Sequence, residues 1–255
     1  MFLFVKTRYQ YDSYWDLYQL AQLSGIPICY PDEIAWDSDN TYIISPLNGE
    51  FPNPLPSRSC KIIWLNIERP TKSDGWLFDR PDFDRIWVCD QNWAKRTGSE
   101  FLIMGSHTGL GHMAPKVYDW ISCTYNTNRR QLVWSKISDL YMAPNGWPIT
   151  IEERAAALAA SRLYVVPQQD DPPHAVTPLR FAIAAAYKLP MMYEAANTNI
   201  YPFVDGIDVL HTPYDNFPHR IREALANPAI VDIGEALHQR LCINTDFRRS
   251  IESII

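Results

Sequence analysis

The stretch "SRLYVVPQQDDPPHAVTPLRFAIAAAYKLPMMYE", residues 161–194, contains two apolar runs with a polar loop and an alanine-rich segment between them. The runs "RLYVVP" and "LPMMYE" are continuous rather than alternating, which is typical of strands buried on both faces of a parallel sheet. The segment "LRFAIAAAY" has the composition and length of a helix. A strand, helix and strand in this order predict a right-handed crossover between parallel strands. The stretch therefore predicts an α/β fold.

The same rhythm runs through the rest of the chain. Further strands are expected at 2–7, 26–31, 41–46, 61–67, 85–90, 101–106, 118–125, 140–144 and 207–213, with helices between many of them and two helical segments at the end. Thr150 and Glu153 form the sequence pattern of a capping box. The glycine-rich stretch 105–117 separates two halves. We therefore expect two Rossmann-like, doubly wound domains, 1–112 and 113–255, the second carrying the closing helices.

Composition narrows the class of protein. The chain has 255 residues, 47% of them hydrophobic, and a formal net charge of −6, which argues against binding nucleic acid through bulk positive charge. Its five cysteines are widely spaced and form no CxxC pair, so neither a zinc cluster nor a disulfide framework is expected. The first apolar run is too short for a signal peptide, and no run is long enough to span a membrane. A reducing cytoplasm is the expected location.

Arg180 lies in the first turn of the helix expected after residue 177, where the helix dipole disfavours a cation. Thr177 suits the N-cap position and Pro178 the first helical position. The unpaired N–H groups of such a turn form an anion site, and the arginine fork matches phosphate oxygens. A bound diphosphate would offset the placement of Arg180. An ion pair from Arg180 to Asp170 or Asp171 is the alternative.

Ligands of open α/β sheets bind at the carboxyl ends of the strands, so the residues just past each strand are candidates. Glu194 could accept hydrogen bonds from sugar hydroxyls, or it could cap the following segment or pair with Arg180. His107 could face a ligand or have a structural role. The full set in the second half is Asn145, Gln168, Gln169, Asp170, Asp171, Glu194 and Tyr214, and in the first half Arg8, Asn48, Glu68, Asp90 and His107.

The sequence lacks the usual motifs for binding a nicotinamide cofactor, ATP or a metal ion. Neither GxGxxG nor GxxxxGK[ST] occurs, which disfavours a nicotinamide enzyme and a P-loop ATPase. The six histidines are scattered, and His107 and His112 are not at helical spacing, so no metal site is expected.

Two α/β halves, a glycine-rich linker and two terminal helices resemble a compact GT-B glycosyltransferase. The stretch 161–194 is similar to the donor-binding core of family 1/4-like and spore-coat-maturation-type enzymes, in which an arginine or glutamate opens the helix and an acidic residue ends the next strand. Arg180 matches that arginine. Lys188 stands where glycine is usual, and Ile183 lies near the place of the second glutamate of the E-x7-E pair.

The resemblance implies a metal-independent transfer from a nucleotide-sugar donor, a UDP-sugar first among them, to an acceptor hydroxyl, with no further cofactor and with chemistry in an interdomain cleft. It implies that the C-terminal domain holds the donor and the N-terminal domain the acceptor. If the reaction inverts the anomeric centre, a general base is required, and Glu68 is the first choice and His107 the second. The residues expected to bind the donor are Arg180, Thr177, Gln168, Asp170, Glu194 and Asn145, and those expected to bind the acceptor are Arg8, Asn48 and Asp90.

Two alternatives stay open at this stage. The acceptor could be a hydroxylated pyrimidine base in DNA, as in phage enzymes of similar fold, and basic residues near the linker could follow a nucleic-acid backbone. The chain could also be a non-catalytic protein that binds nucleotide sugars. The basic residues in question are Lys95, Arg96, Lys116, Arg129, Arg130 and Lys136.

Overall fold

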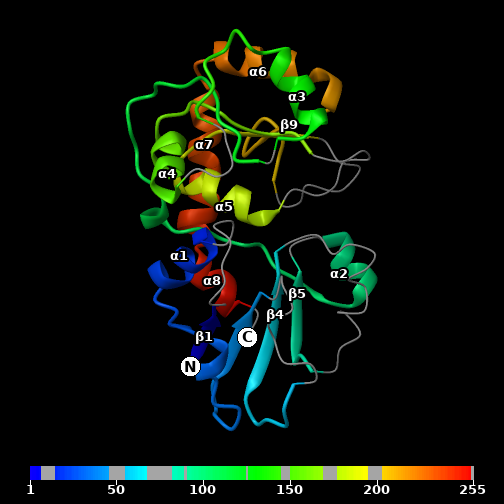
Figure 1. The fold of residues 1–255 in the computed structure, drawn as a ribbon. Coiled ribbons are helices and arrows are strands. Elements are labelled where there is room, and N and C mark those ends of the chain that lie inside the picture. The colour runs from blue at the N-terminus through cyan, green and yellow to red at the C-terminus, as the bar shows by residue number, and fades with distance from the viewer. Residues whose placement is uncertain are drawn as a thin grey trace. The chain divides into compact units, whose positions relative to one another are not determined.

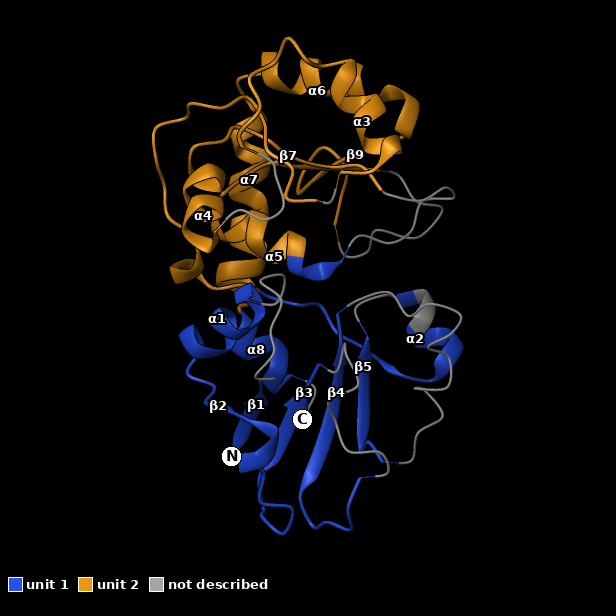
Figure 2. Cartoon of the chain, viewed as in Figure 1, with its two compact units in different colours: residues 1–105, 177–179, 247–255 blue, residues 106–176, 180–246 orange. Residues whose placement is uncertain are grey.

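The chain folds into two compact units, which Figure 2 shows in separate colours. The computed structural model describes residues 1–6, 15–45, 55–67, 82–88, 91–124, 126–144, 150–168, 177–194 and 203–253, without the side chains of residues 92 and 93. Unit 1 consists of residues 1–105, 177–179 and 247–255, and unit 2 of residues 106–176 and 180–246. The chain first passes from unit 1 to unit 2 between residues 105 and 106, at the start of the predicted linker. The predicted boundary at 112/113 stays a prediction, and the contacts assign the last helix to unit 1.

Unit 1 is built on a six-stranded parallel sheet of order β2-β1-β3-β4-β5-β6 (Figure 1). Apolar residues of consecutive strands fill the two faces of the sheet, as the continuous runs predicted. Phe4 contacts Tyr18 of α1 and Phe247 of α8 on one face. Its elements are β1 Phe2–Val5, α1 Trp15–Leu23, β2 Ile28–Cys29, η2 Pro31–Glu33, β3 Thr41–Ile44, β4 Lys61–Asn66, β5 Arg85–Val88, α2 Gln91–Thr97, β6 Glu100–Phe101 and α8 Phe247–Glu252.

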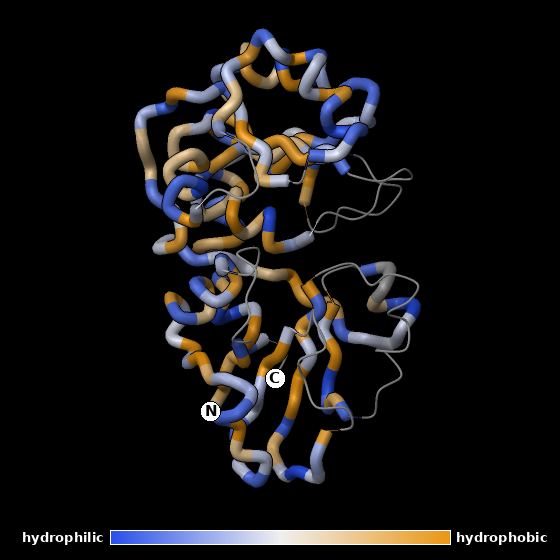
Figure 3. Tube along the Cα trace, viewed as in Figure 1, coloured by the Kyte–Doolittle hydropathy of each residue, from blue (hydrophilic) through white to orange (hydrophobic). Residues whose placement is uncertain are grey.

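Unit 2 contains a three-stranded parallel sheet of order β7-β8-β9, again formed from apolar runs (Figures 1 and 3). Helices α3 and α6 cover one face of this sheet, and Phe181 of α5 packs against Tyr193 on the other. Its elements are η4 Thr108–Leu110, α3 Asn128–Ser135, α4 Ile151–Ala159, β7 Tyr164–Val166, α5 Pro178–Ala186, β8 Met191–Glu194, β9 Leu210–Thr212, η5 Tyr214–Asn216, α6 Phe217–Ala226, α7 Ile230–His238 and the π-helical segment η6 Gln239–Asn244.

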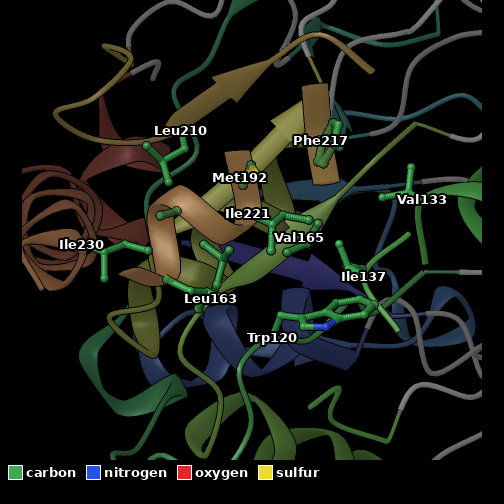
Figure 4. Packing of buried hydrophobic residues seen from close by; sticks show 12 residues of the cluster. Trp120, Val133, Ile137, Leu163, Val165, Met192, Leu210, Phe217, Ile221 and Ile230 are labelled. Carbon is green, nitrogen blue, oxygen red and sulfur yellow. The ribbon is translucent and has the colours of Figure 1, made fainter. Parts of the chain in front are cut away.

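The core of unit 2 joins the sheet to α3 and α6 (Figure 4). Val165, Met192 and Leu210 come from the three neighbouring strands and point to the same face, as the period of a strand requires. Phe217 and Ile221, one helical turn apart on α6, pack on them and are fully buried. This core fixes the three strands relative to α3 and α6, and therefore fixes the position of the residues that follow each strand.

Isolated parallel bridges extend this sheet beyond β7. Residues 118–121 pair with 161–164 through two bridges, and Trp120 pairs with Met142 on the other side. The strands expected at 118–125 and 140–144 are therefore present only as isolated bridges and not as continuous ladders. The order across unit 2 becomes 142, 118–121, β7, β8 and β9. After 118–121 the chain adds residue 142 on one side of that segment and then crosses to add β7 on its other side, so the order of the strands reverses between 118–121 and β7.

Local signals in the sequence agree with the structure. The Thr150 side chain accepts from the Glu153 N–H at 3.1 Å and the Glu153 carboxylate accepts from the Thr150 N–H at 2.8 Å, which confirms the capping box. Gly25, two residues after the end of α1, has a φ of 69°, a left-handed conformation that glycine adopts readily.

The turn after α5 is closely packed. Lys188 has a φ of 50°, the left-handed conformation for which glycine is the usual residue. A Cβ atom at Gly111 would lie 2.3 Å from the Ala186 carbonyl oxygen, and one at Gly234 would lie 2.3 Å from that of Lys188. Only glycine therefore fits at these two positions, and the end of α5 is held between two stretches of backbone.

Candidate functional site

The reversal between 118–121 and β7 is a topological switch point, the place where open α/β sheets bind ligands. The carboxyl ends of 118–121 and β7 lie next to each other there. Helix α3 follows the first of these segments and α5 follows the second. We call these two strand ends, with the first turns of α3 and α5, the switch-point site.

Arg129, in the first turn of α3, forms a two-pronged ion pair with Glu194 at the end of β8. Nη1 donates to Oε2 and Nη2 to Oε1, both at 2.5 Å. Glu194 is only 2% exposed, so its charge is almost entirely removed from water. Bidentate pairs of this kind combine strength with a fixed geometry. The arginine of α3 is therefore neutralised and fixed in orientation.

The backbone of Gln168 completes this pair. Its N–H donates to Glu194 Oε2 at 2.9 Å, and its carbonyl accepts from Arg129 Nη1 at 3.0 Å. The side-chain Nε2 of Gln168 is buried and has no hydrogen-bond partner among the described residues. A buried amide without a partner is costly, and such a group at a strand end is a candidate ligand contact.

Tyr214, two residues after the end of β9, contacts the same arginine through its ring and its hydroxyl. Its ring centroid lies 3.7 Å from the Arg129 guanidinium carbon, within the range of a cation–π contact. Its hydroxyl donates to the Arg129 carbonyl oxygen at 2.5 Å. Burial raises the pKa of Tyr214, while the charge of Arg129 acts in the opposite direction. The neighbouring Arg130 is itself buried, and its Nε donates to the Pro167 carbonyl at 2.9 Å.

Arg180 has a different environment. Its Nη1 donates to the Cys123 carbonyl at 3.0 Å and approaches the Tyr164 hydroxyl at 3.5 Å. Both partners are neutral, and no carboxylate of the described residues forms an ion pair with Arg180. Burial raises the pKa of Tyr164 to about 12, with Arg180 as the largest opposing influence, so the phenol remains neutral. Arg180 thus carries a charge that the described part of the chain does not compensate.

His107 caps the short helix η4 in unit 2. Its Nδ1 accepts a hydrogen bond from the Gly109 N–H at 3.0 Å. A neutral imidazole with Nδ1 as acceptor carries its proton on Nε2, so Nε2 is a donor in this arrangement. This geometry does not suit the role of general base at Nε2.

The structure brings together part of the predicted set. Gln168 and Glu194 lie in one hydrogen-bonded network, and Arg180 belongs to the same switch-point site. Glu194 was expected to accept from ligand hydroxyls or to pair with Arg180, whereas both of its oxygens bind Arg129. Thr177 precedes α5 and is half-buried. The predicted residues Glu68, Asp170, Asn145, Arg8, Asn48 and Asp90, like Gln169 and Asp171, lie outside the described residues.

Two members of the network had no role in the donor site expected from the sequence. The sequence marks Arg129 only as a basic residue that could contact nucleic acid, and Tyr214 only as one of many residues past a strand. The Thr127 side chain accepts from the Arg130 N–H and caps α3, so the N-cap pattern after a strand was the available signal. Three of the six basic residues near the linker donate to carbonyls or carboxylates of unit 2 itself, namely Lys116, Arg129 and Arg130.

Among the described residues, no group of three or more histidine, cysteine, aspartate and glutamate side chains could hold a metal ion. No helix in the described part of the chain is long and apolar enough to cross a membrane. Four cysteines, Cys29, Cys60, Cys123 and Cys242, are described, and none of them forms a disulfide with another.

Comparison with known proteins gives similarity in structure. No protein-family model matches the chain, and no curated protein matches it in sequence. AviGT4, a glycosyltransferase involved in avilamycin A biosynthesis, superposes with a TM-score of 0.65 at 12% identity, over 99% of this chain and 96% of AviGT4. WaaG, a glycosyltransferase involved in lipopolysaccharide biosynthesis, gives a TM-score of 0.53 at 7% identity, over 100% of this chain and 98% of WaaG.

A mutant of TarM from S. aureus, solved with UDP bound, gives a TM-score of 0.60 at 10% identity over 88% of this chain. The chain spans only 55% and 56% of the length of two TarM structures that it matches. Identities this low establish the fold alone. That fold is two α/β units with parallel sheets, the GT-B fold, which confirms the fold class expected from the sequence.

Proposed function

We propose that this chain, which has the GT-B fold, transfers a sugar from a nucleoside diphosphate sugar to a hydroxyl group of an acceptor. One observation carries the proposal: Arg180 brings to the switch point of unit 2 a charge that no carboxylate of the described residues compensates. A cation in the first turn of a helix is unfavourable unless an anion joins it, and a diphosphate is the anion that a nucleotide-sugar donor supplies.

In the donor complex, we expect Arg180 to bind the diphosphate through Nη2 and Nε, because only Nη1 donates to the described part of the chain. The N–H groups of the first turn of α5 would contribute beside it. These groups stabilise the charge that develops on the leaving diphosphate, and such preorganised donors are usually the largest contribution to catalysis. We propose that this compensation serves in place of a metal ion.

Gln168 and Glu194 take separate roles in this proposal. The buried Nε2 of Gln168 needs an acceptor, which a hydroxyl or carbonyl oxygen of the donor could supply. Both oxygens of Glu194 hold Arg129, and one of them also holds the Gln168 backbone, so we assign Glu194 as a positioning residue. Asp170, Asn145 and Thr177 remain predicted donor contacts, and Arg8, Asn48 and Asp90 remain predicted acceptor contacts.

In the chemical step, the acceptor oxygen bonds to the anomeric carbon as the bond from that carbon to the diphosphate oxygen breaks. The hydroxyl proton passes to a general base in an inverting reaction, or to the departing phosphate in a retaining one. Glu68 remains our first choice for the base. The orientation of His107, whose Nδ1 already accepts from Gly109, favours hydrogen-bond donation to a substrate oxygen instead.

The test is thermal unfolding with UDP, UDP-glucose, GDP, ADP and dTDP. A ligand present at 100 times its dissociation constant should add about 2.7 kcal/mol of stability. Arg180→Ala should abolish this gain. Arg220→Ala, which removes an exposed arginine of α6 that pairs with Glu223, is the matched control and should leave it unchanged. If no nucleotide stabilises the chain, or if Arg180→Ala keeps the full gain, the donor site is not here.

Turnover separates the enzyme from a binding protein. Release of free UDP from UDP-sugar, with or without added acceptor, is expected for a glycosyltransferase. If UDP-sugars bind but no release of UDP or transfer of sugar is detected with any acceptor, including hydroxymethylated DNA, the alternative of a non-catalytic binding protein holds.

A further inference from the structure

The sheet of unit 1 has a switch point of its own. Its order β2-β1-β3-β4-β5-β6 places β2 on one side of β1 and all later strands on the other. The chain therefore reverses direction across the sheet between β1 and β3. The residues that follow these two strands, Lys6 and Ser45, are neighbours in the parallel register that pairs Val5 with Ile44. This edge lies in a different unit from Arg180.

Lys6 brings a positive charge to this edge. Its Nζ lies 5.2 Å from the ring centroid of Trp15 and 5.5 Å from that of Tyr18, both in α1. No carboxylate of the described residues forms an ion pair with Lys6. Its ammonium lies over two aromatic rings, which fix its position without a negative charge from the described residues.

Ser45 and Trp15 add two further features. Lys6 and Ser45 point to the same face of the sheet, because they continue the pairing of Phe4 with Ile43 two residues later. The Ser45 hydroxyl forms no hydrogen bond with the described part of the chain. The Trp15 ring, over which the ammonium lies, is half-buried and apolar. A charge, a hydroxyl and a ring face thus meet at one strand edge.

We infer that this edge, formed by Lys6, Ser45 and Trp15, binds an anionic sugar, one that carries a phosphate or a carboxylate beside its ring. The ammonium pairs with the anionic oxygens, the serine hydroxyl donates to them, and the ring of the sugar lies on Trp15. Its role as the acceptor site rests on the function proposed above, whereas the binding of the anionic sugar does not.

The experiment measures calorimetric binding of glucose 6-phosphate, glucuronate and glucose. Lys6→Gln should weaken both anionic sugars by about tenfold or more. Lys61→Gln is the matched control, since Lys61 is an exposed lysine at the first position of β4, the opposite end of the same sheet, and should change binding by less than about twofold. Trp15→Leu should weaken all three sugars, and the phosphate and carboxylate arms show which anion the edge prefers.

Crossed variants separate this site from the donor site. Arg180→Ala should leave glucose 6-phosphate binding unchanged, and Lys6→Gln should leave UDP binding unchanged. If UDP does not bind but Lys6 still governs glucose 6-phosphate, the proposed function fails and this site stands. Equal losses in Lys6→Gln and Lys61→Gln would overturn it, as would no binding of either anionic sugar below about 10 mM.

Two further measurements, the melting temperature of the variant and its binding of a duplex oligonucleotide, test the fold and the class of ligand. Lys6→Gln must retain the melting temperature of the unaltered chain, and if it does not, Lys6→Arg should restore binding with the charge. If a duplex oligonucleotide binds with a steep salt dependence that Lys6→Gln removes, while anionic sugars do not bind, the ligand is a nucleic acid and the inference is wrong.

Discussion

Two arginines at the same edge of unit 2 have opposite surroundings. Arg129 faces a buried carboxylate, lies on the ring of Tyr214 and donates to the Gln168 carbonyl. Arg180 donates to one carbonyl and approaches one phenol, both uncharged. One positive charge is compensated by a carboxylate of the fold, and the other has no charged partner among the described residues. Two arginines at one edge of a sheet can therefore differ in how far the chain itself compensates their charge.

The largest effect is expected at Arg129. Arg129→Leu leaves the Glu194 carboxylate buried without its counter-charge, which should cost about 3–5 kcal/mol of unfolding free energy. Urea unfolding followed by circular dichroism measures it. The double variant Arg129→Leu with Glu194→Leu removes both charges and should recover at least half of the loss. A loss below about 1 kcal/mol in the single variant would contradict the pairing described here.

The next effect comes from the phenol beside Arg180. Tyr164 has an ordinary pKa of 10, which burial raises to about 12 in the folded chain. Between these values the unfolded state loses the proton and the folded state keeps it, so stability should fall as pH rises from about 10, by about 2–3 kcal/mol in total. Burial also raises the pKa of Tyr193, which adds to the fall.

Tyr164→Phe isolates the contribution of the first phenol. The variant should lose less stability between pH 10 and 12 than the unaltered chain does, whereas Tyr141→Phe, at an exposed tyrosine, should follow the unaltered chain. Chemical denaturation at several alkaline pH values gives the comparison. An identical fall with and without the Tyr164 hydroxyl would show that this phenol does not titrate late.

A smaller effect is expected at Tyr214. Tyr214→Phe removes the hydrogen bond to the Arg129 carbonyl and should cost about 1 kcal/mol. Tyr214→Leu also removes the ring beneath the guanidinium and should cost about 1 kcal/mol more. Urea midpoints of the two variants measure the two steps. If Tyr214→Leu is no worse than Tyr214→Phe, the ring does not support Arg129.

The smallest effect on stability is expected at Arg180. In the absence of ligand, Arg180→Ala loses one hydrogen bond to a carbonyl and should shift the unfolding free energy by no more than about 1 kcal/mol. Urea unfolding of the ligand-free chain measures it. Taken with Arg129→Leu, this variant completes the contrast. A loss as large as that of Arg129→Leu would mean that Arg180 is also a structural residue.

The sequence was sufficient for the fold, and it singled out Arg180, whose contact with a donor stays a prediction. Continuous apolar runs predicted parallel strands, and these formed in both units. The run 101–106, however, shares only Phe101 with the two-residue strand β6, and the runs 118–125 and 140–144 form only isolated bridges. Arg180 stood out because helix electrostatics is a local property, visible within one turn. Lys188, where glycine was expected, does adopt the left-handed conformation that the glycine would serve.

The contacts of Arg129 with Glu194 and Tyr214 could not be predicted from local sequence patterns. Glu194 lies 65 residues along the chain from it, and Tyr214 lies 85 residues away. No periodicity or cap connects positions so far apart, because they meet only through the strand order and the length of each crossover. A bidentate pair between distant residues becomes predictable only when the register of the sheet is known.

The turn at Lys188 has a consequence for the opposite end of α5. Because an α-helix advances by about 100° per residue, a helix clamped at one end has a defined azimuth everywhere along it. Gly111 and Gly234 clamp the carbonyls of Ala186 and Lys188, about two turns from Arg180. The direction in which the guanidinium points therefore depends on contacts at the other end of the helix. We expect a single methyl group added at either glycine to rotate or displace Arg180 without contacting it.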